Sequence, residues 1–137
     1  IAGLATVTKQ IPASPPPAIG EMWRGGVYAG ISVGTKDQPD GHLVLLTTTP
    51  DDKLDWQTSA DWAKSLGDGA HVPTLSESAL LHANLPNEFD VDNWYWTSTV
   101  YETKAAWIKY FNEDSHCCTT WKSADNLCRA VRRYPVY

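Results

Sequence analysis

Stretches of apolar and β-branched residues, bounded by turn-forming residues, predict several short strands in this chain. Residues 25–33 and 42–48 form the first two, and the loop between them is rich in Gly, Pro and Asp, which is typical of a hairpin connection. From residue 93 the pattern alternates, so that Trp94 and Trp96 share one face of a strand. Further short strands are expected at residues 105–111, 116–122 and 127–133.

Two helices are expected between the early and the late strands. Residues 57–66 have apolar positions spaced for one helix face, and Gly67 is a natural end for that helix. The second helix opens at Thr74, which matches a capping box with Glu77: each side chain bonds the free N–H of the other residue. Pro86 lies just beyond the expected end of this helix.

The first 22 residues differ from the rest, because Ala, Thr, Ser and Pro dominate them and three prolines in a row favour an extended polyproline conformation. We therefore divide the chain into an extended N-terminal arm or linker at 1–22 and a single domain at 23–137. One interpretation of the arm is a flexible tail. The other is a segment that lies along a neighbouring subunit, for which the candidate assembly residues are Ile11, Pro15, Pro16, Pro17 and Ile19.

Charge limits the classes of partner. The formal net charge is −5 and the pI is near 5.2, so nucleic acid is not an expected partner, since phosphate binding needs a basic face. No stretch approaches the ~18 apolar residues of a membrane span, and no membrane partner is expected. We interpret the local basic cluster of Arg129, Arg132 and Arg133 as ion-pair partners for the acidic excess.

Four segments form a widely spaced pattern along the chain: His71-Val-Pro-Thr-Leu75, Trp94-Tyr-Trp-Thr-Ser-Thr99, Ala105-Ala-Trp-Ile-Lys-Tyr-Phe111 and Arg129-Ala-Val-Arg-Arg133. This order resembles the DUF1566 family, also called the Lcl C-terminal domain family, whose members usually read LPT-x-x-E, YWSST, AW-x-x-F and RAVR. The resemblance implies an α+β fold of the C-type-lectin-like class. It predicts two helices flanking a small antiparallel sheet, here preceded by the extended Pro-rich N-terminal arm.

Motifs of common catalytic sites do not occur in the sequence. It has no G-x-S-x-G nucleophile elbow, no phosphate-binding G-x-x-x-x-G-K-[ST] and no H-E-x-x-H. We therefore expect no enzymatic activity, no catalytic residue, no cofactor and no bound metal. A calcium site at the oxygen-rich residues 86–93 stays open as an alternative, although these residues match neither the Glu-Pro-Asn nor the Trp-Asn-Asp motif of sugar-binding lectins.

The three cysteines, Cys117, Cys118 and Cys128, are an odd number, which argues against a secreted disulfide framework. Free thiols are expected, and one bridge from Cys117 or Cys118 to Cys128 is the alternative. The family is also distantly similar to formylglycine-generating enzymes, which use a Cys pair on a metal, but the rest of that machinery has no counterpart in this chain.

Residues 112–126 are the best candidate for a recognition surface, because they mix polar side chains with aromatic ones as adaptable binding surfaces do. An ordinary strand-turn-strand surface is the alternative. The candidate binding residues are Asn112, Asp114, His116, Thr119, Trp121, Lys122, Asp125 and Asn126.

The ending RAVRR-x-P resembles DUF1566-like proteins encoded by tailed bacteriophages. This resemblance implies a virion component made in the host cytoplasm: a decoration, fibre or tail-tip protein. Residues 1–22 would bind other virion subunits or copies of the same chain, and the lectin-like surface would engage a host glycan or protein. The alternatives are a surface adhesin that recognises host glycans and a cytosolic inhibitor of a host protein.

Overall fold

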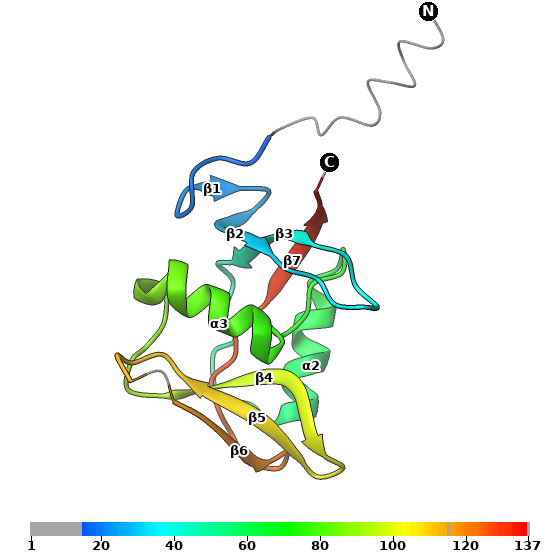
Figure 1. Cartoon of the computed structure of the whole chain (residues 1–137). Coiled ribbons are helices and arrows are strands. Elements are labelled where there is room, and N and C mark those ends of the chain that lie inside the picture. Colours follow the sequence, from blue (N-terminus) through cyan, green and yellow to red (C-terminus); the bar gives the residue numbers. More distant parts are fainter. Residues whose placement is uncertain (1–14, 115, 137) are drawn as a thin grey trace, which may run out of the picture.

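The computed structural model describes residues 15–114 and 116–136, and its architecture is α+β with antiparallel sheets (Figure 1). The elements in chain order are β1 (Met22–Trp23), β2 (Gly26–Ser32), β3 (Gly41–Leu46), α2 (Trp56–Ser65), α3 (Leu75–Asn84), the 3-10 turn η1 (Pro86–Glu88), β4 (Trp94–Glu102), β5 (Ala105–Tyr110), β6 (Cys117–Trp121) and β7 (Val131–Pro135). Ile11 of the expected arm lies outside the described residues.

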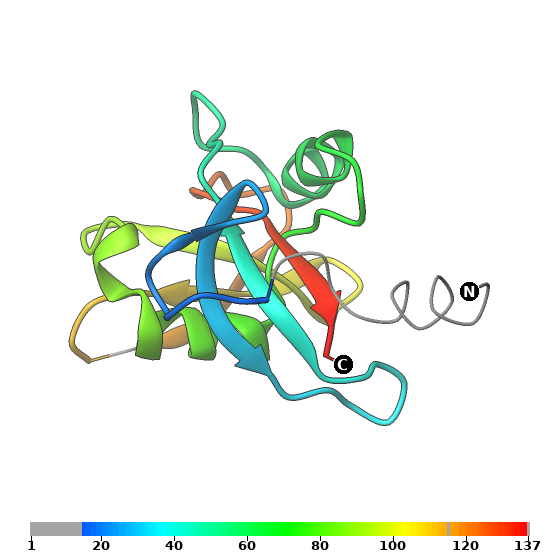
Figure 2. The same ribbon diagram turned by 90° about the horizontal axis from the view of Figure 1, so that it is seen from above.

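The last strand, β7, joins the sheet that the first hairpin begins, and Figure 2 shows β2, β3 and β7 side by side. The strand order of this sheet is β1-β2-β3-β7. Leu45 of β3 pairs with Val27 on one side and with Val131 on the other. Every residue of β3 is buried, which explains why its sequence is a nearly continuous apolar run. The two ends of the domain are therefore held in one sheet.

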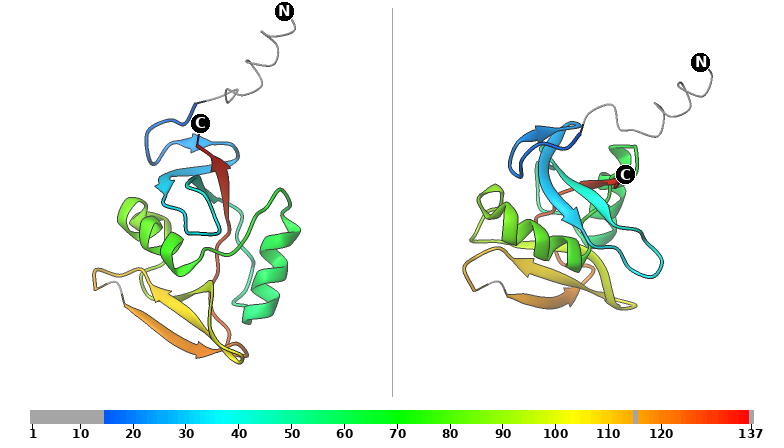
Figure 3. Two further views of the ribbon diagram at one scale, coloured as in Figure 1. Left: turned by 45° about the vertical axis from the view of Figure 1, so that its right-hand side comes forward. Right: turned by 45° about the horizontal axis from the view of Figure 1, so that its top comes forward.

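A second sheet has the strand order β4-β5-β6. Helix α3 lies between the two sheets, in contact with β2 on one side and with β4 and β5 on the other (Figure 3). Helix α2 packs against β4. The buried apolar side chains form two clusters, one containing Trp96 and the other containing Leu43 and Leu81. Burying each such side chain contributes roughly 1.5–3 kcal/mol, so these clusters hold both sheets and α3 together.

Both helices begin and end where local sequence directs them. Asp55 caps α2 by accepting the N–H of Thr58 at 2.8 Å, and Gly67 just beyond the helix has a φ of +79°, which favours glycine. The capping box at α3 is confirmed, because Thr74 Oγ1 accepts the Glu77 N–H at 3.1 Å and Glu77 Oε1 accepts the Thr74 N–H at 2.9 Å. These caps fix the direction in which α3 enters the space between the sheets.

The structure corrects the expected number of sheets and one strand boundary. Two antiparallel sheets are present among the described residues where the resemblance implied one. The strand expected at 127–133 begins only at Val131, because the residues before it cross between the sheets. Leu127 bonds the backbone of Trp94 and Trp96 in the second sheet, and the Ala130 carbonyl accepts the Leu46 N–H in the first. Residues 127–130 are thus a connection rather than a strand.

The arginine cluster behaves differently from the expectation of ion pairs. Arg133 forms an ion pair with Glu77. Arg129 instead donates to the carbonyls of Glu88 and Leu46 at 2.6 and 2.9 Å, and Arg132 donates to the carbonyls of two residues at the end of α2. Within the residues that the structure describes, neither forms an ion pair. Their donors satisfy carbonyls that helix ends and turns leave free, which is a structural role.

Candidate binding site

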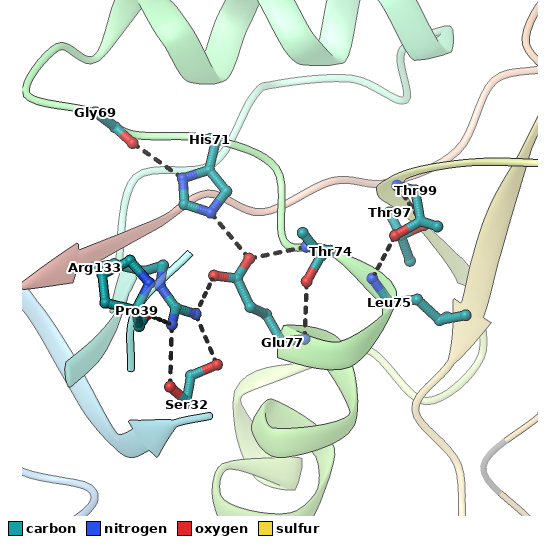
Figure 4. Close-up of polar contacts among 10 residues, drawn as sticks. All are labelled: Ser32, Pro39, Gly69, His71, Thr74, Leu75, Glu77, Thr97, Thr99 and Arg133. Atoms are coloured by element: carbon teal, nitrogen blue, oxygen red, sulfur yellow. Dashed lines mark hydrogen bonds and ion pairs between the residues drawn. The ribbon is translucent and has the colours of Figure 1, made fainter. Parts of the chain in front are cut away.

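Glu77 in the first turn of α3 is a carboxylate with only 1% of its surface exposed. One of its oxygens accepts hydrogen bonds from the Thr74 N–H and from His71 Nε2, both at 2.9 Å (Figure 4). The other lies 3.0 Å from Arg133 Nη1. Arg133 comes from β7, so a single buried carboxylate ties α3 to the last strand of the first sheet.

Thr74, His71, Glu77 and Arg133 form a polar cluster. Arg133 extends this cluster to the first hairpin. Its guanidinium donates to the Ser32 hydroxyl at 2.8 Å, to the Ser32 carbonyl at 3.0 Å and to the Pro39 carbonyl at 2.9 Å. Arginine suits this position because its planar fork presents several donors in fixed directions. The cluster therefore connects three parts of the chain that are far apart in sequence.

The pKa values reflect these contacts. Burial alone would raise the pKa of Glu77, but the hydrogen bond and charge of His71, the Thr74 N–H and Arg133 lower it from 4.5 to about 2. For His71, burial lowers the pKa, and the hydrogen bond and charge of Glu77 outweigh that effect and raise it. Glu77 is consequently ionised at neutral pH, and its negative charge is compensated by His71 at one oxygen and by Arg133 at the other.

A cleft of about 570 Å³ opens beside this cluster, lined in part by Ser32, Thr99 and Arg133. Several polar groups of its lining already make hydrogen bonds within the protein. Ser32 accepts from Arg133, and Thr99 Oγ1 accepts the Leu75 N–H at 2.9 Å. Because these groups already have partners within the fold, the cleft offers a ligand few unused hydrogen-bonding groups from Ser32, Thr99 and Arg133.

A different groove, of about 380 Å³, lies on the second sheet at the end of β6. It is lined by Tyr101, Glu102, Ala105, Thr119, Thr120 and Trp121. Tyr101 and Trp121 are 58% and 62% exposed, which is unusual for large aromatic side chains and marks candidate contact residues. Because β4 and β6 both pair with β5, residues about twenty positions apart meet at this one place.

Polar groups of this groove are not used by the fold. Among the described residues, the side chains of Glu102, Thr119, Thr120 and Trp121 make no hydrogen bond or ion pair. The Tyr101 ring packs edge to face against the ring of the half-buried Trp107, with the two ring centroids 5.7 Å apart. The groove thus combines aromatic surface with free hydrogen-bonding groups, as ligand sites do.

The sequence-predicted surface residues lie along the whole of β6 and its flanks. Thr119 and Trp121 line the groove. Asn112 and Asp114 lie in the β5–β6 turn, and the exposed His116 follows it, at the opposite end of β6 from Trp121. These three residues do not belong to the groove lining.

The remaining predicted residues follow β6. Lys122 places its Nζ 4.2 Å from the centre of the Trp56 ring, and Asn126 pairs its backbone with Leu54. Asp125 is exposed. Sequence reasoning missed Tyr101 and Glu102, which precede the β4–β5 turn; the available signal was a polar and aromatic pair at a hairpin end.

The oxygen-rich segment considered for calcium is organised as a local turn. Asp90 accepts the Asp92 N–H at 2.9 Å and the Asn93 side-chain amide at 2.8 Å. No group of three His, Cys, Asp or Glu side chains that could hold a metal ion occurs in the described part of the chain. The three cysteines are free thiols: Cys117 and Cys118 are exposed and Cys128 is buried.

A comparison with protein-family models gave no match, and a comparison with curated protein sequences gave none either. In the described residues, no helix is long and apolar enough to cross a membrane. The structure is that of a small α+β domain with antiparallel sheets and a groove on its second sheet.

Proposed function

We propose that this chain is a non-enzymatic binding module of the C-type-lectin-like class and a component of a bacteriophage particle. The observation that carries the binding role is the groove between Tyr101 and Trp121, whose aromatic and polar groups face solvent on a firmly paired sheet. Two features support the lectin-like class: a first hairpin that pairs with the last strand, and two helices packed against the sheets.

The particle role rests on the sequence pattern Arg129-Ala-Val-Arg-Arg133 followed by Pro135, which resembles phage-encoded relatives of the DUF1566 family. The geometry is compatible with attachment at one end and recognition at the other. Residue 15, where the described chain begins, and the end of β7 lie on the side opposite to the β4-β5-β6 sheet (Figure 1).

Density-gradient purification of phage particles from the source, with quantification of this chain by mass spectrometry, tests the particle role. We expect a fixed copy number beside the coat or tail proteins. A variant lacking residues 1–14 keeps every described residue, so we expect it to fold and to be absent from particles. Recovery of the full chain only outside the particle band would refute the particle role.

A cytosolic inhibitor of a host protein is the second candidate, and the free thiols favour it, since unpaired cysteines are typical of a reducing compartment. Affinity purification from infected cells separates the two candidates. One host protein recovered in stoichiometric amount, together with absence from particles, would support the inhibitor.

A further inference from the structure

The groove on the second sheet has a rigid floor and two aromatic walls. Ala105, at the start of β5, pairs directly with Trp121 of β6, and its small side chain leaves the space between the walls open. The Lys122 N–H donates to the Lys104 carbonyl at 2.8 Å, which fastens the end of β6 to the β4–β5 turn. Trp121 is thus held by backbone pairing, and Tyr101 lies at an irregularity of β4 between Val100 and Glu102, which both pair with β5. A ligand would therefore bind at strand residues rather than at a loop that it must order.

The polar groups of the groove suit a ligand with many hydroxyl groups. The Glu102 carboxylate can accept hydrogen bonds, and the hydroxyl of Thr119, which shares a strand face with Trp121, can donate or accept them. The Trp121 indole adds a donor at the rim. Aromatic faces pack against the C–H faces of a sugar ring, while carboxylate and hydroxyl groups bond its edges. Together the lining offers both kinds of contact that a pyranose presents.

The charges of the chain and of the groove lining limit the classes of ligand that can bind. The chain carries a net charge of −5, and the charged side chain of the groove lining is the acidic Glu102. Of the two adjoining lysines, Lys122 places its Nζ over the Trp56 ring, and Lys104 lies in the β4–β5 turn outside the lining. An anionic ligand, such as a sulfated glycan or a phosphate, would be repelled by the net charge and by Glu102. A calcium ion needs six to eight oxygen ligands, several of them carboxylates, and this lining holds one carboxylate. The contacts therefore favour an uncharged ligand that binds without a metal.

We propose that the Tyr101–Trp121 groove binds a neutral glycan through a terminal pyranose ring, without calcium. The proposal rests on the binding role proposed above and specifies its ligand. The pyranose packs between Tyr101 and Trp121, and Glu102 accepts hydrogen bonds from its hydroxyls. The volume of about 380 Å³ lies at the lower end of the ~300–1,000 Å³ range of small-molecule sites, which fits one or two sugar rings better than a folded partner.

An array of neutral and sulfated glycans, probed with the full chain in EGTA, tests this proposal, followed by calorimetry with the best neutral oligosaccharide. We expect binding to neutral glycans in EGTA and none to the sulfated set. Trp121→Ala should weaken the affinity about fivefold or more, since an aromatic packing contact contributes on the order of 1 kcal/mol, which corresponds to about fivefold. Glu102→Gln should weaken it several-fold, because an uncharged amide accepts hydrogen bonds less strongly.

Matched variants separate binding from folding. Ile31→Ala removes an exposed apolar side chain from the other sheet, and Glu113→Gln removes an exposed carboxylate from the β5–β6 turn. Both should leave glycan affinity unchanged, and all four variants should keep the melting temperature of the natural chain. Failure to bind any neutral glycan, loss of binding in EGTA, or unchanged affinity of Trp121→Ala would overturn the proposal. Particle incorporation is measured separately, so a virion protein without glycan affinity would be recognised.

Discussion

The buried carboxylate of Glu77 gives a prediction whose size can be worked out from the structure. Replacing Glu77 by Gln keeps the shape of the side chain but removes the charge that His71 and Arg133 compensate. The difference between the ordinary pKa of 4.5 and the value of about 2 in the folded protein, at 1.36 kcal/mol for each pKa unit, corresponds to about 3 kcal/mol of stability. Glu77→Gln should lose this amount at about pH 5 to 6, where Glu77 is ionised and His71 is protonated.

The dependence on pH has a defined sign. The pKa of Glu77 is lowered by folding, so its contribution is complete above about pH 4.5 and is lost as the pH falls through about 2. The pKa of His71 is raised, so its contribution is complete below pH 6.5 and is lost as the pH rises through the folded value. The natural chain should therefore exceed Glu77→Gln in stability by the largest margin at about pH 5 to 6.

Urea unfolding followed by tryptophan fluorescence measures this margin. We expect about 3 kcal/mol at about pH 5.5 and less than about 1 kcal/mol at about pH 2, with Glu113→Gln as the exposed control that changes neither value by more than about 0.5 kcal/mol. A margin that stays constant between these two pH values would refute the reasoning. It would mean that shape and hydrogen bonding, rather than charge, determine what Glu77 contributes.

Three further predictions concern local features. Thr74→Ala should lower the free energy of unfolding by about 1 kcal/mol, because it removes the cap of α3; an unchanged urea midpoint would contradict this. Gly26→Ala should destabilise by roughly 1–3 kcal/mol, because the added carbon would press on the Leu45 carbonyl; a calorimetric melting temperature equal to that of the natural chain would be inconsistent with such packing. A thiol reagent should label Cys117 and Cys118 in the folded protein and Cys128 only after denaturation, and three equally fast reactions would disprove the burial of Cys128.

Local signals in the sequence predicted the helices well. The Thr74 and Glu77 capping box and the glycine after α2 act within a few residues, so their effect does not depend on the rest of the fold. The first hairpin was also predictable, because its loop composition is decisive over a short range. In contrast, the pairing of β7 with β3 joins residues such as Leu43 and Arg133, and no local pattern specifies that choice.

The candidate site was predictable only in part. Thr119 and Trp121 were recognised because a polar and aromatic mixture on a short strand is visible in the sequence. Tyr101 and Glu102 were not, because they approach Trp121 only through the register of β4, β5 and β6. An ion pair of Arg133 with an acidic residue and a capping role for Glu77 were both expected, and both are present. That these two residues are partners was not predictable, because they meet only when α3 packs against the first sheet.

Because β7 is the last strand of the first sheet to be synthesised, that sheet can be completed only late in translation. Glu77 leaves the ribosome 56 residues ahead of Arg133, and β3 is complete long before its second neighbour exists. Until then the nascent chain carries an apolar strand with one open edge and a carboxylate without its arginine. Folding dominated by such distant pairings is slow. The growing polypeptide should therefore stay sensitive to proteases and chaperones until the last strand has emerged.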